Sequence, residues 1–194
     1  AISEEIISTR RDFHKHPELA FNEYRSDKII AEKLTSFGLD VETGVGKTGV
    51  VGILNPNHTG KTIALRADMD APPIQETGDV EYASQNDGVM HACGHDAHMT
   101  IVTSLALYIR EAKPEINGKI RFIFQPAEEQ APGGAIAMID GGAIEGVDHI
   151  IGGHVFPKLP SDKIGLKHGP MAATVEMIEI ELKGPGGHTS RPAE

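Results

Sequence analysis

The chain of 194 residues is long enough for one domain and the start of a second, and 39% of its residues are hydrophobic, enough to build a core. Its formal net charge is −10 at pH 7 and it has no run rich in lysine or arginine, which excludes the charge pattern of nucleic-acid or anionic-membrane binding. Its single cysteine excludes a disulfide-stapled secreted scaffold.

Two helices are predicted in the first forty residues. The first covers residues 3–16, with Ser3 as its N-cap and Pro17 ending it. The second covers residues 22–37, where apolar residues recur at helical spacing and Gly38 follows as the C-terminal cap.

The pattern then changes to short apolar runs rich in β-branched residues, which predict strands. These runs are Val50–Leu54, Thr62–Arg66, Ile120–Phe124 and His149–Gly152. Further helices are predicted over His98–Ala112 and Gly134–Asp140. Because strands and helices alternate, we expect an α/β sandwich with a central, mostly parallel or mixed sheet flanked by helices.

Residues 173–194 are interpreted as the start of a smaller α+β domain. Apolar and charged residues alternate along Ala173–Lys183, which is typical of a strand buried on one face. Since the sequence stops before this element closes, residues 1–172 are expected to form a first domain and residues 173–194 to begin a second, truncated one. The apolar stretches are far shorter than the ~20 residues of a spanning helix and no export signal is evident, so we expect a cytoplasmic protein.

The densest group of metal-binding residue types is His-Ala-Cys-Gly-His-Asp-Ala-His at residues 91–98. If this segment is extended, Cys93 and His95 project to the same side, and Gly94 allows the backbone to come close. Zinc and similar metals accept such a mixed sulfur and nitrogen set. The alternative is that His95 and His98 form local hydrogen bonds at the next helix and that Cys93 is a buried thiol.

Other candidate residues follow three of the predicted strands. They are Asp70, the adjacent Glu128 and Glu129, and His154. Ligand sites of α/β sheets gather at the carboxyl ends of strands, so folding can bring these groups to one edge. Adjacent acids diverge, so one can bind metal while the other acts as general base, and an aspartate can support a metal-bound histidine. Taken singly, each is typical of solvated surface, a turn or a structural histidine.

Five short motifs are spread over nearly the whole chain. In order they read HKHPEL (14–19), RADMDA (66–71), MHACGHDAH (90–98), QPAEE (125–129) and GPGGH (184–188). Together they resemble the amidohydrolase branch of the aminoacylase and carboxypeptidase G metallopeptidases. That branch includes hippurate hydrolases, auxin-conjugate hydrolases and N-acetyldiaminopimelate deacetylases.

The resemblance implies a hydrolase of N-acyl amino acids with two divalent metal ions (Zn, Mn, Co or Ni). Carried over position by position, the metal ligands are Cys93, His95, Glu129 and His154. The same comparison implies Glu128 as general base, Asp70 as support behind the ligands, and His188 as the group that stabilises the tetrahedral intermediate. It also implies a homodimer formed through the domain starting near residue 173, and a further histidine ligand that these 194 residues lack.

Two other functions stay open. In the first, Cys93 is a nucleophile activated by a nearby histidine, and chelation would leave activity intact. In the second, the 194 residues form a metal-binding or interaction module without turnover, because a ligand and most of the second domain are absent.

Overall fold

The computed structural model describes residues 2–173, 178–181, 183–184, 186 and 190. The chain divides into two compact units, Ala1–Lys158 and Leu159–Glu194. In the second unit, the described residues are exposed and none of them belongs to a helix or strand. None of the described helices is long and apolar enough to cross a membrane.

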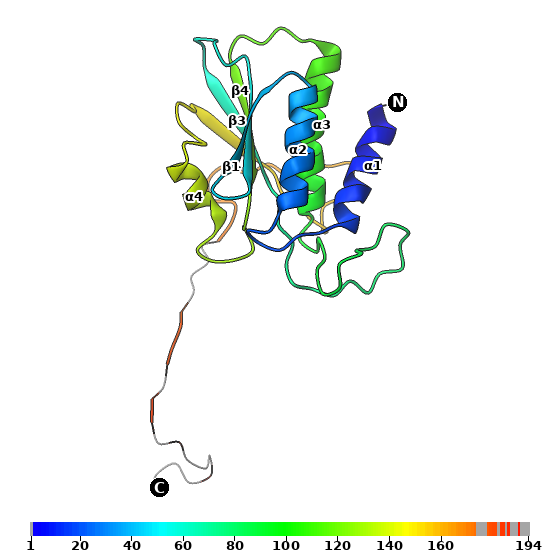
Figure 1. Ribbon diagram of the computed structural model, residues 1–194, viewed down its shortest axis with the longest axis vertical. Coiled ribbons are helices and arrows are strands. Elements are labelled where there is room, and N and C mark those ends of the chain that lie inside the picture. Colours follow the sequence, from blue (N-terminus) through cyan, green and yellow to red (C-terminus); the bar gives the residue numbers. More distant parts are fainter. Residues whose placement is uncertain (1, 174–177, 182, 185, 187–189, 191–194) are drawn as a thin grey trace. The chain divides into compact units, whose positions relative to one another are not determined.

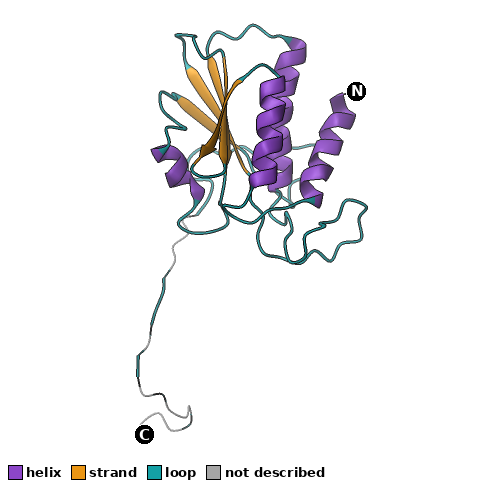
Figure 2. Cartoon of the chain, viewed as in Figure 1, coloured by secondary structure: helices purple, strands orange, loops and turns teal. Residues whose placement is uncertain are grey.

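The first unit is a five-stranded mixed sheet with helices on both faces (Figures 1 and 2). Its elements in chain order are α1 (Ile2–Lys15), α2 (Tyr24–Ser36), β1 (Asp40–Val45), β2 (Gly49–Leu54), β3 (Thr62–Asp68), α3 (His95–Ala112), β4 (Lys119–Gln125), α4 (Gly134–Asp140) and β5 (His149–Gly152). The strand order is β1-β2-β4-β3-β5.

Three neighbouring strands of this sheet are parallel. β3 pairs in parallel with β4 on one side and with β5 on the other, whereas β2 runs antiparallel to both β1 and β4. The carboxyl ends of β3, β4 and β5 therefore meet at one edge, where Asp68 pairs with Gln125 and Arg66 with Gly152. α3 begins in the loop that follows β3, and its first residues complete this edge.

Apolar side chains fill both sides of the sheet. α1, α2 and α3 cover one face and α4 covers the other (Figure 1). The larger core lies under the three helices and includes the fully buried Phe13, Ile30, Leu34, Met99, Phe122 and Phe124. Burying each such side chain contributes about 1.5–3 kcal/mol to the free energy of folding. This core therefore stabilises the sheet from which the loops at the strand ends extend.

Most of the sequence-based predictions for this unit are confirmed, including the α/β fold class with a mixed sheet. The four predicted strands all form, and the two N-terminal helices match to within two residues at each end. Gly38 adopts φ +86 after α2, as a C-terminal cap requires. Ser3 is not an N-cap, because α1 already includes Ile2.

β1 is a strand that the sequence pattern does not predict, and α3 begins three residues before its predicted start at His98. β1 is largely polar and exposed, and it is held as an edge strand by backbone pairing with β2, which leaves no apolar pattern in the sequence. α3 begins at His95, directly after Gly94, whose φ of +84 turns the chain into the helix. Cys93 and His95 therefore do not lie in an extended segment as predicted; a turn brings them together.

The predicted strand over Ala173–Lys183 is wrong for the part that the structure describes. Residues 178–181 have no strand pairing, and Ile178 and Ile180 are exposed, as is Glu179 between them. A one-face-buried strand needs a partner strand, and none of the described residues supplies one. The domain boundary at residues 172 and 173 stays a prediction.

Candidate metal centre

His95 lies at the centre of the candidate site. Its Nδ1 donates a hydrogen bond to the backbone carbonyl of Asp70 at 2.7 Å, so its Nε2 keeps a free lone pair. This Nε2 is buried and has no hydrogen-bond partner among the described residues. It lies 3.6 Å from Asp68 Oδ2 and 3.8 Å from a carboxylate oxygen of each of Glu128 and Glu129. A buried lone pair facing three carboxylates is an environment that suits a bound cation.

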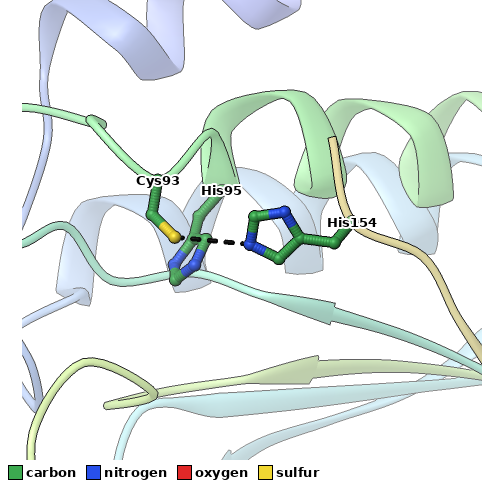
Figure 3. Close-up of side chains that lie close together, drawn as sticks. All are labelled: Cys93, His95 and His154. Atoms are coloured by element: carbon green, nitrogen blue, oxygen red, sulfur yellow. Dashed lines mark hydrogen bonds between the residues drawn. The ribbon is translucent and has the colours of Figure 1, made fainter. Parts of the chain in front are cut away.

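Cys93 and His154 face each other beside this group (Figure 3). Cys93 Sγ lies 3.3 Å from His154 Nε2. His154 Nδ1 donates to the carbonyl of Val155 at 2.7 Å, which leaves its Nε2 as the unprotonated nitrogen. Each histidine therefore offers Nε2 to the same small space, and each is held in that tautomer by a backbone carbonyl.

The Cys93 thiol is strongly held in its protonated form. Burial, a hydrogen bond with Glu129 and the nearby carboxylate charges raise the pKa of Cys93 to about 12. A coordinating metal ion would reverse this balance, because metal binding displaces the thiol proton. Without a cation, the thiol is a poor nucleophile.

Asp70 holds the backbone of the two glutamates in place. Its two carboxylate oxygens accept the backbone N–H groups of Glu128 at 2.8 Å and Glu129 at 2.9 Å. Asp70 is fully buried; burial by itself would raise its pKa, but hydrogen bonds from His95 and from these two N–H groups lower it. Asp70 therefore orients the loop after β4 through its carboxylate and the start of α3 through its backbone carbonyl.

The structure brings most of the predicted site residues together. Three groups of possible ligands have donor atoms within 4.8 Å of one another, and all three include His95: Cys93, His95 and His154; His95, Glu128 and Glu129; and Asp68, His95 and His98. Their individual roles remain predictions. His188 lies outside the described residues.

Asp68 and His98 are not among the predicted ligands or catalytic residues, but both lie beside His95. Asp68 is buried at the end of β3, and its Oδ1 lies 2.6 Å from Nδ1 of His98. Burial alone would raise the pKa of Asp68, but the hydrogen bond from His98 and the charge of Arg66 lower it well below its usual range. The available signal was the spacing, since Asp68 precedes Asp70 by two residues and His98 follows His95 by three.

The donor set fits a divalent metal ion. Thiolate, imidazole and carboxylate donors together suit zinc and the neighbouring first-row metals. The carboxylates of Asp68, Glu128 and Glu129 provide the negative charge, and the buried Nε2 of His95 lacks any other described partner. Cys93, His95, His154, Glu128 and Glu129 form two of the three groups whose donor atoms lie close enough to hold such ions.

Known proteins resemble this chain over its whole length. Thermostable carboxypeptidase 2 of Saccharolobus solfataricus is 47% identical over 195 residues, which covers 100% of this chain and 50% of that protein. An N-acyl-L-amino acid amidohydrolase of Geobacillus stearothermophilus is 43% identical over 191 residues, covering 98% of this chain and 52% of that protein. The chain thus spans about half the length of the relatives that it matches.

Solved structures and family models agree with these relatives. The crystal structure of Bacillus subtilis YXEP protein, described as a dinuclear metal binding peptidase from the M20 family, superposes with a TM-score of 0.81 at 42% identity, covering 87% of this chain and 48% of that one. The model of peptidase family M20/M25/M40 matches residues 64–193. This confirms the resemblance inferred from the five motifs, and the chain belongs to peptidase family M20/M25/M40, a family of hydrolases.

Proposed function

We propose that the protein hydrolyses the amide bond of N-acyl amino acids at a dinuclear metal site. The observation that carries the proposal is the buried Nε2 of His95, which has no hydrogen-bond partner among the described residues and lies 3.8 Å from a carboxylate oxygen of each of Glu128 and Glu129. The amidohydrolase named among the relatives and the dinuclear peptidase among the solved structures support it. Because this chain spans half of such relatives, the proposal concerns the whole protein.

Four residues would hold the ions in this proposal: Cys93, His95, Glu129 and His154. When bound, the two divalent ions lower the pKa of a water molecule toward ~7 and polarise the amide carbonyl. Zn, Mn, Co and Ni are all compatible with this mixed set of donors. Glu129 suits a ligand better than Glu128 does, because its side chain is 25% exposed against 42% and it hydrogen bonds the Cys93 thiol.

Glu128 would act as general base and then as general acid. Asp70 fixes the backbone of Glu128, while the side chain of Glu128 stays open to solvent and to substrate. It takes a proton from the attacking water and delivers it to the amine nitrogen as the C–N bond breaks. The products are a carboxylic acid and a free amino acid. His188 is proposed, from the family resemblance, to stabilise the tetrahedral intermediate.

The remaining parts of the proposal concern substrate, assembly and location. Hippurate-like and N-acetyl amino acids are the proposed substrates, and no nucleic-acid or membrane partner is proposed. A homodimer formed through the domain that starts near residue 173, and a cytoplasmic location, remain predictions.

The two alternatives differ in what supports them. A cysteine nucleophile is disfavoured because burial and the surrounding carboxylates raise the pKa of Cys93, so little thiolate forms near neutral pH. A metal-binding module without turnover is favoured only for the 194 residues in isolation, since the family resemblance implies a ligand outside them. Comparing the activity of this chain with that of the whole protein, with Mn²⁺ or Zn²⁺ added, separates a module without turnover from the proposed metal-dependent hydrolase.

The test combines metal analysis with hydrolysis assays on the whole protein. Wild type, Glu128→Gln and the control Glu32→Gln, which changes an exposed residue of α2, are assayed with hippurate and a panel of N-acetyl amino acids. We expect Glu128→Gln to keep its metal and to lose turnover by about 100-fold or more. Glu32→Gln should match wild type. Wild-type turnover in Glu128→Gln, or full activity after chelation, would overturn the proposal.

A further inference from the structure

His154 sits on a segment that the sheet does not hold. β5 ends at Gly152, and residues 153–156 have no regular secondary structure. The described hydrogen bonds of this segment's backbone are made by Val155, which follows His154. The backbone N–H of Val155 donates to His98 Nε2 at 2.9 Å, and its carbonyl accepts from His154 Nδ1 at 2.7 Å. The orientation of His154 therefore depends on where Val155 is placed.

The hydrogen bond from Val155 determines the tautomer of His98. A backbone N–H can only donate, so His98 Nε2 must accept and cannot carry a proton. The proton of the neutral ring is then on Nδ1, which donates to Asp68 Oδ1 at 2.6 Å. Both ring nitrogens are occupied, so His98 has no lone pair left for a metal ion, although it lies in a group with Asp68 and His95.

Asp68 links this arrangement to the sheet. Its other oxygen, Oδ2, accepts from Arg66 Nη1 at 2.7 Å. Arg66 in turn donates through Nε and Nη2 to the side-chain oxygen of Gln125 at 3.0 and 2.8 Å. Because Asp68 and Gln125 are paired residues of the parallel strands β3 and β4, the chain of contacts begins in the paired strands of the sheet.

We infer that His98 is a positioning residue, which in its Nδ1–H tautomer holds Val155 and thereby points His154 Nε2 at Cys93 and His95. The rings of His98 and His154 also pack edge to face, with centroids 4.5 Å apart and planes at 70°. The inference rests on the proposed function in one respect only, namely that His154 is there to bind metal. Residues that orient a metal ligand in this way commonly change metal affinity by about 10- to 100-fold when replaced.

The first experiment reads the tautomer without metal or substrate. Long-range ¹H–¹⁵N correlation spectra of the metal-free whole protein, with labelled histidine, distinguish a protonated Nδ1 from a protonated Nε2. We expect His98 to be a single Nδ1–H tautomer. A His98 ring protonated on Nε2 would overturn the inference whatever the enzyme does.

The second experiment measures binding of Mn²⁺ by calorimetry to wild type and three variants. His98→Leu removes the acceptor, His98→Gln keeps a donor and an acceptor, and Thr103→Val changes a buried α3 hydroxyl that has no described hydrogen-bond partner. We expect His98→Leu to weaken binding of at least one ion about 10-fold or more, and His98→Gln and Thr103→Val to stay within about 3-fold. If His98→Leu fails to fold, the tautomer of His98 in the wild-type protein decides whether the inference holds. His98→Gln is not expected to weaken Mn²⁺ binding more than Thr103→Val does.

The outcomes separate this inference from the proposed function. Wild-type protein that binds no metal and hydrolyses nothing removes the proposed function, while the tautomer still tests the arrangement of His98. Wild-type metal affinity in a folded His98→Leu removes the inference and leaves the proposed function standing.

Discussion

Glu23 Oε1 accepts the backbone N–H of Ala127 at 2.8 Å, although 104 residues separate the two in the sequence. Glu23 precedes α2 and is fully buried, and it also accepts hydrogen bonds from the N–H of Phe21 and the hydroxyl of Thr48. Ala127 has a φ of +49, which L residues rarely adopt, and it directly precedes Glu128. A buried carboxylate from the start of α2 thus stabilises the strained backbone beside the proposed general base.

Replacing Glu23 is expected to destabilise the fold. Glu23→Ala leaves the buried N–H of Ala127 and the hydroxyl of Thr48 without their acceptor, at a cost of about 1–3 kcal/mol for each unsatisfied group. Glu23→Gln keeps one oxygen and should cost less. Urea unfolding of both variants measures the change, with the exposed Glu32→Ala as a control expected within about 0.5 kcal/mol of wild type. A Glu23→Ala protein as stable as wild type would contradict the role given to Glu23.

Asp70→Asn tests the support beneath the two glutamates. Each oxygen of Asp70 accepts one backbone N–H, so an amide places its NH₂ group against the N–H of either Glu128 or Glu129. We expect turnover to fall about 10- to 100-fold with the protein still folded. Steady-state kinetics and circular dichroism check this, with the exposed Asp87→Asn from the same loop as control. Unchanged kcat in Asp70→Asn would show that the backbone of Glu128 and Glu129 does not need the carboxylate of Asp70 as an acceptor.

Gly94→Ala tests the close packing of Val155 on the start of α3. A Cβ at Gly94 would lie 2.3 Å from Val155 Cγ2, and its φ of +84 is unfavourable for alanine. Gly88 has a similar φ of +73 but open space around its Cβ position, so Gly88→Ala carries the backbone cost of about 1–2 kcal/mol alone. We therefore expect both variants to lose stability, and Gly94→Ala alone to lose metal affinity. Equal metal affinity in the two variants would show that Val155 does not position His154.

His14 is expected to make the free energy of unfolding depend on pH. Its pKa is raised, first by a hydrogen bond with Asp96 at 2.7 Å and further by Glu76, while burial and Arg10 lower it; the Tyr82 ring packs edge-on against it. Since the folded pKa exceeds the unfolded value of 6.5, this stabilisation is fully present below pH 6.5 and is lost as pH rises through the folded pKa. The contribution of His14 to the stability of the metal-free protein should therefore fall as the pH rises above 6.5.

The matched variants for this pH effect are His14→Gln and His149→Gln. Glutamine at position 14 cannot bind the extra proton, so the decline in unfolding free energy with pH should be smaller than in wild type. His149 is exposed on β5, and its replacement should leave the wild-type profile unchanged. A His14→Gln profile parallel to wild type would assign the pH dependence to other groups.

The helices and strands differ in how far the sequence predicts them. Val50–Leu54 and Ile120–Phe124 are recognisable because apolar, β-branched side chains carry the signal themselves. β1 was missed because its stability comes from backbone pairing with β2, to which its polar side chains contribute little. The start of α3 was misplaced because it depends on the left-handed conformation of Gly94.

By itself the sequence determined which chemical groups follow the strands and that three strand ends supply them, since residue type and hydrophobic period are local properties. The tertiary structure alone decided that the lone pair of His95 faces Asp68, Glu128 and Glu129, and that Glu23 and His98 hold backbone groups from distant segments. Such hydrogen bonds depend on distance and direction to a few tenths of an ångström, and these are set only when the sheet and helices pack together.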